Sequence, residues 1–179
     1  MHGSPLTTVT RIASHLVGHN LVARYLYGMK SDLRLGRQLC FALYAASRAA
    51  VNLYRPVLEP LGLTYPQYLV LLVLWEHGDT SIKDLGAALM LDSGTLSPLV
   101  KRMESAGLVH RARRVDDERS VLVSLTPAGR ALRRKAAAVP TTIAAAAGLP
   151  EADLVDLRDR LVALTESISP SRTTERSHP

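Results

Sequence analysis

The chain has 179 residues, of which 47% are hydrophobic and 21% are charged, so it holds enough apolar material for a packed core and is not wholly disordered. Its 22 Lys and Arg residues outnumber 16 Asp and Glu, and the net charge of +6 favours a polyanionic partner such as DNA. The single cysteine, Cys40, excludes an internal disulfide framework and a multi-thiolate zinc site.

Other site classes and a membrane location are also disfavoured by the sequence. No run of about 18 apolar residues occurs, and the N-terminus lacks the layout of a signal peptide. Among six histidines only His15 and His19 have a ligand-like spacing, so we expect neither a metal nor a cofactor. A cytoplasmic protein without a membrane span is the expectation.

The N-terminal half predicts helices. Residues 1–31 mix small polar and short apolar runs, and this extension is either an extra helix or, as the alternative, a loose arm or a mis-assigned start. From Asp32, apolar residues three and four apart predict a helix that Pro56 and Pro60 break. Thr64 then caps a helix that is apolar almost all round and ends at 77–79, which predicts the buried central helix.

The middle of the chain predicts a helix-turn-helix followed by a hairpin. Ser81 and Asp84 match a capping box for a short helix that ends near Leu89, and a second helix is expected over 93–105. Two strands are expected over 108–113 and 120–125, with a charged tip between them. This hairpin is the wing of a winged helix-turn-helix.

Two helices are expected after the wing. Thr126 and Pro127 cap a helix that continues to about Ala146, and a last amphipathic helix spans 151–168 before a polar tail at 169–179. The predicted fold is therefore mainly α with a small β-hairpin wing: a winged helix-turn-helix at 64–126, flanked by helical regions at 32–63 and 127–168.

Several segments carry a family resemblance. Residues 89–107, 117–119 and 123–130 are similar to the MarR family of dimeric transcriptional regulators. Residues 38–48, 53–56 and 61–68 resemble, more narrowly, the OhrR group of organic-hydroperoxide sensors. The resemblance covers about 33–168. It implies a homodimer that binds double-stranded DNA at a palindromic operator, with both flanking helical regions used for dimerisation.

The expected DNA contacts come from the recognition helix and the wing. Hydroxyl and basic side chains suit phosphates and base edges, and the candidates are Ser93, Thr95, Ser97, Lys101, Arg102, Arg113, Arg114, Asp117 and Arg119. From Asp92 to Lys135, ten Lys or Arg against five Asp or Glu leave a surplus of five charges. The resemblance implies that Arg119 enters the minor groove, oriented by Asp117. The alternative is that the hairpin is solvated and held by its own salt bridges. The same alternative applies to Arg111, Arg113 and Arg114.

Cys40 is the candidate sensor. A lone helical cysteine is usually an inert core residue, but Tyr44 lies one turn away on the same face. In a continuous helix Tyr54 would lie about 21 Å from Cys40 along the axis. A Tyr54 that contacts Cys40 would therefore have to come from the partner chain of a symmetric dimer. Tyr65 begins the next helix. Phenolic donors stabilise a thiolate, although these tyrosines could instead be interface packing.

The resemblance implies a repressor that releases its operator when an organic hydroperoxide oxidises Cys40 to a sulfenic acid. With no second cysteine in the chain, a low-molecular-weight thiol would resolve the oxidised sulfur, or further oxidation would follow. Two alternatives stay open. One is a MarR-type repressor that responds to a small aromatic ligand, with Cys40 incidental. The other is a thiol peroxidase, which the missing resolving cysteine disfavours, so we expect no enzyme.

Overall fold

The computed structural model describes residues 33–113 and 121–169. The chain divides into two compact units, one formed by residues 45–149 and the other by 1–44 together with 150–179. The division falls within a helix, after Tyr44, and again before Pro150.

The smaller unit contains a 3-10 turn and long helical segments. The turn η1 (Leu35–Arg37) precedes α3 (Leu39–Leu58), and α9 (Glu151–Ile168) has the predicted bounds. The expectation of a helix from Asp32 is wrong at its start, and Asp32 itself lies outside the described residues. Arg34 and Gln38 have extended backbones, with ψ of 126° and 120°, so an α-helical ladder cannot pass through them.

The end of α3 also differs from the sequence prediction. Pro56 does not break the helix, which continues to Leu58 before the 3-10 turn η2 (Glu59–Leu61). Pro56 lies in the last turn of α3. Its missing N–H removes one hydrogen bond of the helix, and only two helical residues follow it, so the proline is tolerated there. Gly62, with φ of +66°, then completes the turn, as expected.

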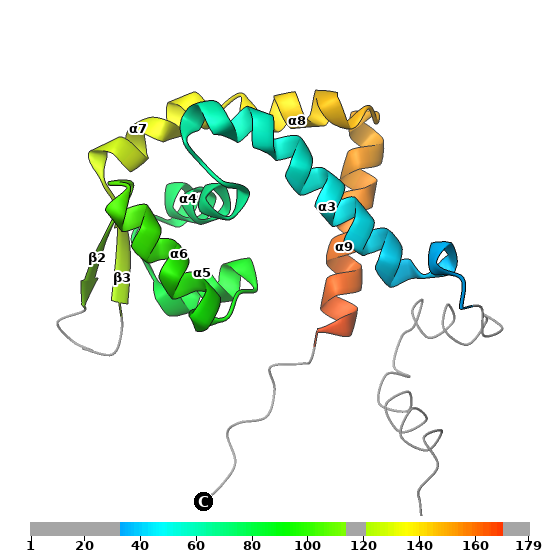
Figure 1. The fold of residues 1–179 in the computed structure, drawn as a ribbon, viewed down its shortest axis with the longest axis horizontal. Coiled ribbons are helices and arrows are strands. Elements are labelled where there is room, and N and C mark those ends of the chain that lie inside the picture. The colour runs from blue at the N-terminus through cyan, green and yellow to red at the C-terminus, as the bar shows by residue number, and fades with distance from the viewer. Residues whose placement is uncertain (1–32, 114–120, 170–179) are drawn as a thin grey trace, which may run out of the picture. The chain divides into compact units, whose positions relative to one another are not determined.

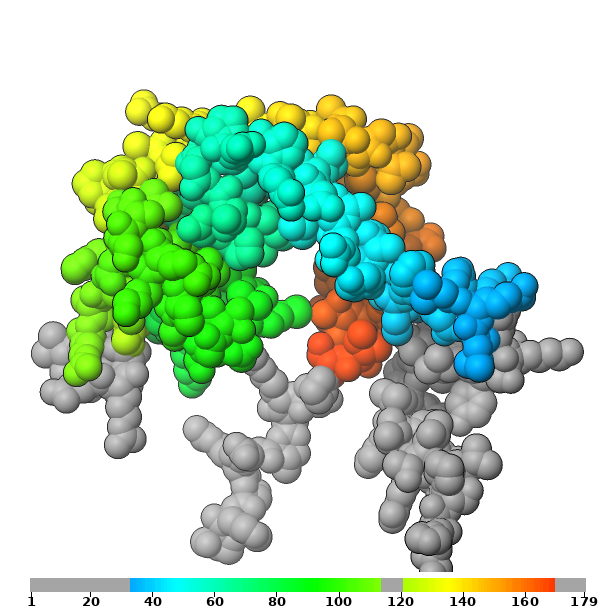
Figure 2. Space-filling model, in the orientation of Figure 1, coloured from blue at the N-terminus to red at the C-terminus, as the bar shows by residue number. Residues whose placement is uncertain are grey.

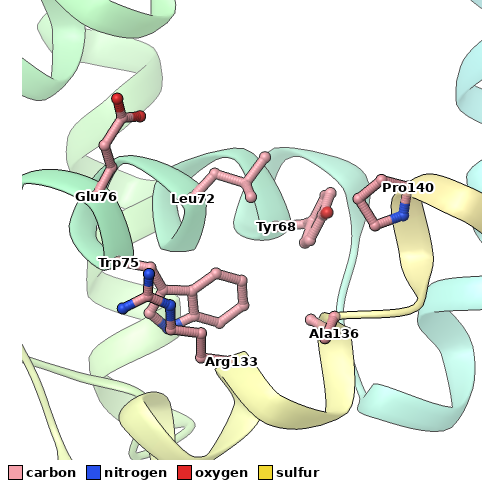
Figure 3. Close-up of a pocket in the computed structure, with 8 residues that line it drawn as sticks. Tyr68, Leu72, Trp75, Glu76, Arg133, Ala136 and Pro140 are labelled. Atoms are coloured by element: carbon pink, nitrogen blue, oxygen red, sulfur yellow. The ribbon is translucent and has the colours of Figure 1, made fainter.

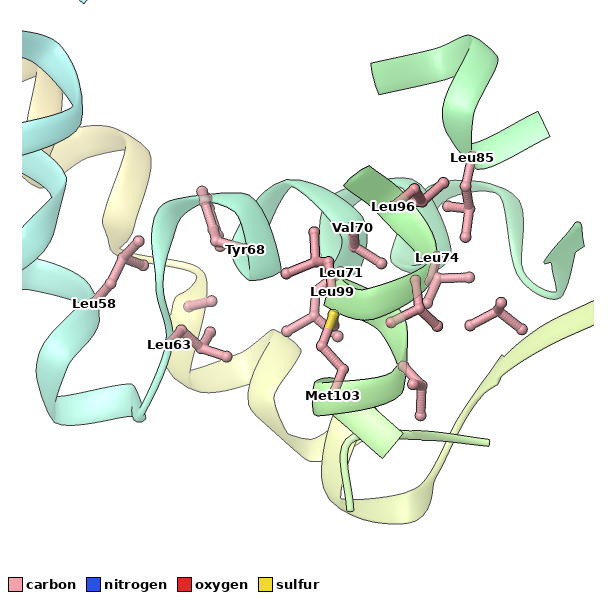
Figure 4. Packing of buried hydrophobic residues seen from close by; sticks show 14 of the residues in the cluster. Leu58, Leu63, Tyr68, Val70, Leu71, Leu74, Leu85, Leu96, Leu99 and Met103 are labelled. Carbon is pink, nitrogen blue, oxygen red and sulfur yellow. The ribbon is translucent and has the colours of Figure 1, made fainter. Parts of the chain in front are cut away.

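Helix α4 (Tyr65–His77) is the central helix of the larger unit. The backbone N–H of Thr64 donates to Oε1 of Gln67 at 2.8 Å, which fixes the start of the helix. Tyr68, Val70, Leu71 and Leu74 are buried, which confirms the prediction of a core helix. They belong to one core with buried side chains of the next two helices (Figure 4), and the fully buried members there are Leu85 from the first of these helices and Leu96, Val100 and Met103 from the second.

The helix-turn-helix is formed by α5 (Ile82–Leu89) and α6 (Ser93–Ser105). The capping box is confirmed, because Ser81 Oγ accepts the N–H of Asp84 at 3.1 Å and donates to its carboxylate at 2.6 Å. The strands β2 (Val109–Arg113) and β3 (Val121–Leu125) form the predicted hairpin beside these helices (Figure 1).

The sheet has a third strand that sequence patterning missed. The two-residue strand β1 (Thr80–Ser81) pairs antiparallel with β3, so the strand order is β1-β3-β2. Thr80 lies opposite Val123, and Arg111 lies opposite the same residue from the other side. A strand of two residues shows no alternation, so only its pairing with β3 defines it. The result confirms a winged helix-turn-helix.

The single helix expected after the wing is in fact two. Helix α7 (Pro127–Ala136) ends before α8 (Val139–Ala147) begins. Pro140 has no N–H to donate to the carbonyl of Ala136, so a continuous helix would lose that bond and crowd the carbonyl. The sequence is rich in alanine on both sides of Pro140, so the spacing of apolar residues alone does not reveal the break.

Within the described residues, no single helix has both the length and the apolar character needed to span a membrane. By length and composition alone, the bent pair of Leu39–Leu61 and Tyr65–His77, at 72° to each other, meets that requirement jointly.

Candidate functional site

Helix α6 separates an apolar face from a polar one. Leu96, Leu99, Val100 and Met103 are buried against the core. The predicted DNA-contacting side chains lie on the opposite side: Ser93, Thr95, Lys101 and Arg102 are exposed, and Ser97 is partly exposed. Helix α6 and strand β2 contact each other, and both reach the surface of the larger unit (Figure 2).

The start of α6 is held by Asp92, which is not among the residues predicted from the sequence to form the site. Its Oδ1 accepts the N–H of Thr95 at 2.9 Å, and its Oδ2 accepts the Thr95 hydroxyl at 2.9 Å. These bonds from Thr95 lower the pKa of Asp92. Since a hydroxyl has one proton, Thr95 in this arrangement faces a ligand only as an acceptor. An Asp immediately before Ser-Gly-Thr was the available signal for a helix cap.

The wing is attached to α6 through Glu104. Its Oε1 accepts the backbone N–H of Arg111 at 2.9 Å, and its Oε2 lies 3.7 Å from Nη1 of the same arginine. Nδ1 of His110 lies 4.0 Å from Oε1. Arg113, two residues further along β2, is exposed. The predicted contacts Arg114, Asp117 and Arg119 lie outside the described residues.

The wing is joined to α7 by Thr126, which confirms the predicted cap. Its hydroxyl donates to the carbonyl of Gly107 at 2.6 Å and accepts the N–H of Gly129 at 3.0 Å. Nε1 of Trp75 donates to the carbonyl of Gly129 at 3.0 Å, which ties α7 to the central helix. Beyond this junction α7 presents exposed cations: Arg130, Arg133, Arg134 and Lys135.

Cys40 is exposed on α3, so within this chain it is not the inert core residue that composition alone favours. Tyr44, one helical turn further on, has 57% of its surface exposed. Both residues belong to the smaller unit.

The other two candidate tyrosines belong to the larger unit, where they contact each other. The ring centroids of Tyr54 and Tyr65 are 4.7 Å apart, and Tyr54 lies 6.0 Å from Tyr68. Burial raises the pKa of Tyr54, and the neighbouring phenols of Tyr65 and Tyr68 add to the effect. Tyr54 is therefore a neutral hydroxyl donor at physiological pH.

A cavity of about 640 Å³ opens beside the central helix (Figure 3). Its walls come from α4 and from the α7–α8 segment, with Trp75 and Arg133 at one end and Tyr68 and Pro140 at the other. Glu76 is the one acidic residue of the lining. In the described parts of the chain, no group of three or more His, Cys, Asp or Glu residues is arranged to hold a metal ion.

Comparison with known proteins identifies relatives of this chain. A family profile described as transcriptional regulator SarA/Rot matches residues 52–135. The organic hydroperoxide resistance transcriptional regulator of Bacillus subtilis (strain 168) is 48% identical over 136 residues, which make up 76% of this chain and 92% of that protein.

Solved structures show the same fold. Reduced AbfR bound to DNA, from Staphylococcus epidermidis, has a TM-score of 0.64 and 35% identity, covering 76% of this chain and 95% of that one. Overoxidized AbfR bound to DNA has a TM-score of 0.62 and 36% identity, covering 76% and 96%. The profile match at residues 52–135 spans α4, α5, α6 and the strands of the wing.

Proposed function

Because the chain belongs to the MarR family of transcriptional regulators and resembles its OhrR group, we propose that it represses transcription and releases its operator when an organic hydroperoxide oxidises Cys40. It is a DNA-binding transcriptional regulator, and its relatives are regulators rather than enzymes. The observation that carries the redox part of the proposal is the exposed, unique Cys40 on α3 with a tyrosine one turn away. We place the protein in the cytoplasm, where its operator would be.

DNA binding uses the face formed by α6 and the wing. Lys101 and Arg102 supply charge for phosphates, while Ser93 and Ser97 reach phosphates or base edges from the first turns of the helix. Arg113 adds an exposed cation on β2, and Arg114, Asp117 and Arg119, outside the described residues, are the further proposed contacts. Two such faces related by a twofold axis would enter successive major grooves about 34 Å apart.

A homodimer is supported by the apolar surface that the single chain leaves exposed. Helix α9 buries no residue, and its exposed side chains include Val155, Leu157, Leu161, Val162 and Ile168. On α3, Phe41, Tyr44 and Val51 are also exposed. Large apolar patches of this kind usually mark protein interfaces. In a symmetric dimer each chain would offer Tyr54 to the partner's Cys40 site.

The sensing step is a two-electron oxidation. The Cys40 thiolate attacks an oxygen of the hydroperoxide, an S–O bond forms, and the O–O bond breaks. The alkoxide leaves with the electron pair and takes a proton to become an alcohol, so the sulfur is oxidised to the sulfenic acid while the hydroperoxide is reduced. A small thiol then displaces water and forms a mixed disulfide with Cys40. Either product changes the volume and hydrogen bonding at the tyrosines.

The test compares DNA binding by the wild type and Cys40→Ser, using DNA from upstream of the protein's own gene. Cumene hydroperoxide is added at one equivalent with a small thiol, and separately in large excess, because AbfR has been solved on DNA in both its reduced and its overoxidized form. Mass spectrometry assigns the sulfur state in each sample. We expect wild type at one equivalent to lose at least tenfold in affinity, about 1.4 kcal/mol, while Cys40→Ser stays bound. Equal release of both proteins, or of neither, contradicts the proposal.

A second candidate function is favoured by the cavity beside α4. Aromatic walls with one arginine suit a small aromatic carboxylate, and a ligand there would make Cys40 incidental. The test measures whether 4-hydroxybenzoate releases the Cys40→Ser variant from DNA. The control is the same protein with Arg133→Gln added. Release that requires Arg133 would favour this candidate over the peroxide sensor.

A further inference from the structure

The geometry points to Glu104 as the positioning residue of the wing, acting through Arg111, which is therefore committed to the protein and not to DNA. This role rests on the proposed DNA-binding face, and neither the basic composition nor the hairpin pattern of the sequence indicates it. It also removes one cation from the set that would otherwise be counted as DNA contacts.

The first observation is the hydrogen bond from the backbone of Arg111. In the strand order β1-β3-β2, β2 is an edge strand, so alternate N–H groups point away from the sheet. The Arg111 N–H points outward and meets Oε1 of Glu104 at 2.9 Å. Glu104 belongs to the last turn of α6, so this bond joins the recognition helix to the wing's edge.

The second observation is the arginine side chain. Its Nη1 lies 3.7 Å from Oε2 of Glu104, and only 27% of the side chain is exposed. Nε is buried and has no hydrogen-bond partner among the described residues. Because the side chain is largely buried, its guanidinium cannot extend to a DNA phosphate as an exposed arginine can. Its charge instead pairs with the carboxylate of Glu104.

The third observation is the contrast with Arg113 on the same face of β2. Side chains two residues apart on a strand share a face, and exposure on that face rises from buried Val109 through Arg111 to exposed Arg113. Glu104 therefore fixes the base of the wing through Arg111, and Arg113 is the arginine of this face that is exposed to solvent. His110 completes the group, with Nδ1 4.0 Å from Oε1 of Glu104.

The test measures DNA affinity as a function of salt for Glu104→Ala, Glu104→Gln, Arg111→Met and Arg113→Met. A variant that no longer neutralises one phosphate has a salt slope smaller by about 0.9. We expect Glu104→Ala to bind about tenfold more weakly, the scale of one good contact, with an unchanged slope. Glu104→Gln should keep most of the affinity, because its amide oxygen still accepts the Arg111 N–H. Arg111→Met should leave the slope unchanged, whereas Arg113→Met should reduce it.

Two results would overturn the inference: a slope reduced by Arg111→Met, or wild-type affinity in Glu104→Ala. Thermal unfolding of each variant shows whether it is folded, and exchange of the Arg111 amide should accelerate in Glu104→Ala but not in Glu104→Gln. If Arg113→Met alone changes nothing, the proposed DNA contact at Arg113 fails, while the role of Glu104 is still decided by the other three variants.

Discussion

The rings of Tyr54 and Tyr65 pack against each other, with centroids 4.7 Å apart and planes tilted by 51°. The contact joins the end of α3 to the first turn of α4, across the turn that Gly62 completes. Aromatic pairs at this separation hold each other's orientation, so the two hydroxyls have a defined direction before any partner arrives. Burial raises the pKa of Tyr54, which keeps its hydroxyl protonated.

Tyr54→Phe should slow the oxidation of Cys40. Removing one hydrogen bond to a charged group costs about 1.5–3 kcal/mol, so a donor to the thiolate is worth roughly tenfold or more in the rate. The measurement is stopped-flow oxidation of reduced protein by cumene hydroperoxide. Tyr68→Phe is the matched control, because Tyr68 is 3% exposed within the core and is not assigned to the thiol. Equal rates in Tyr54→Phe and wild type would remove Tyr54 from the sensor.

Alkaline pH should destabilise the protein through the same aromatic group. The pKa values of Tyr54 and Tyr68 are raised from 10.0, chiefly by burial. Their contribution to stability is complete below the unfolded pKa of about 10 and is lost as pH rises towards the folded pKa, since the unfolded chain ionises first.

Urea unfolding from about pH 9 to about pH 11 tests this sign. The free energy of unfolding should fall with pH in the wild type and fall less steeply in Tyr54→Phe, which has one fewer shifted phenol. Tyr68→Phe should act in the same direction. Identical pH profiles for all three proteins would mean that these tyrosines do not carry the alkaline transition.

Gly129→Ala should destabilise the junction between the wing and α7. A Cβ at Gly129 overlaps the carbonyl oxygen of Leu108, which is backbone and cannot rotate away. Overpacking of this kind costs about 1–3 kcal/mol, measured as a decrease in the free energy of unfolding. Gly36→Ala is the control, because a Cβ there meets nothing within 4 Å. Equal stability of the two variants would show that the junction moves freely.

Much of the fold was predictable because its boundaries are local. Caps at Thr64, Ser81 and Thr126 and the span of α9 depend on neighbouring residues, and each was predicted from them. The break between α7 and α8 was missed although Pro140 was visible, since the alanines around it favour helix on either side. Strand β1 depends on its pairing with β3, in which Thr80 lies opposite Val123, a residue far away in the sequence.

The site was less predictable, because its contacts are tertiary. Strand spacing places Arg111 and Arg113 on one face, yet only the packing of α6 against β2 reveals that Glu104 holds the first of them. The pairing of Tyr54 with Tyr65 likewise needs the turn between two helices to close at a given angle. Sequence patterns therefore propose residue types for the site, while the structure distinguishes the residues committed to internal contacts.

Met90→Gly should stabilise the protein. Met90 is the one non-glycine with positive φ among the described residues, at +55°, and it caps α5 in the turn of the helix-turn-helix. A side chain in the left-handed region costs roughly 1–2 kcal/mol, and glycine removes this cost while losing some entropy on folding, so a net gain of about 0.5–1 kcal/mol is expected. The Met90 side chain is 75% exposed, so the substitution removes little packing. Met90→Ala retains a Cβ and should not gain, as measured by urea unfolding. A decrease in stability in Met90→Gly would mean that the exposed side chain makes contacts which outweigh the backbone cost.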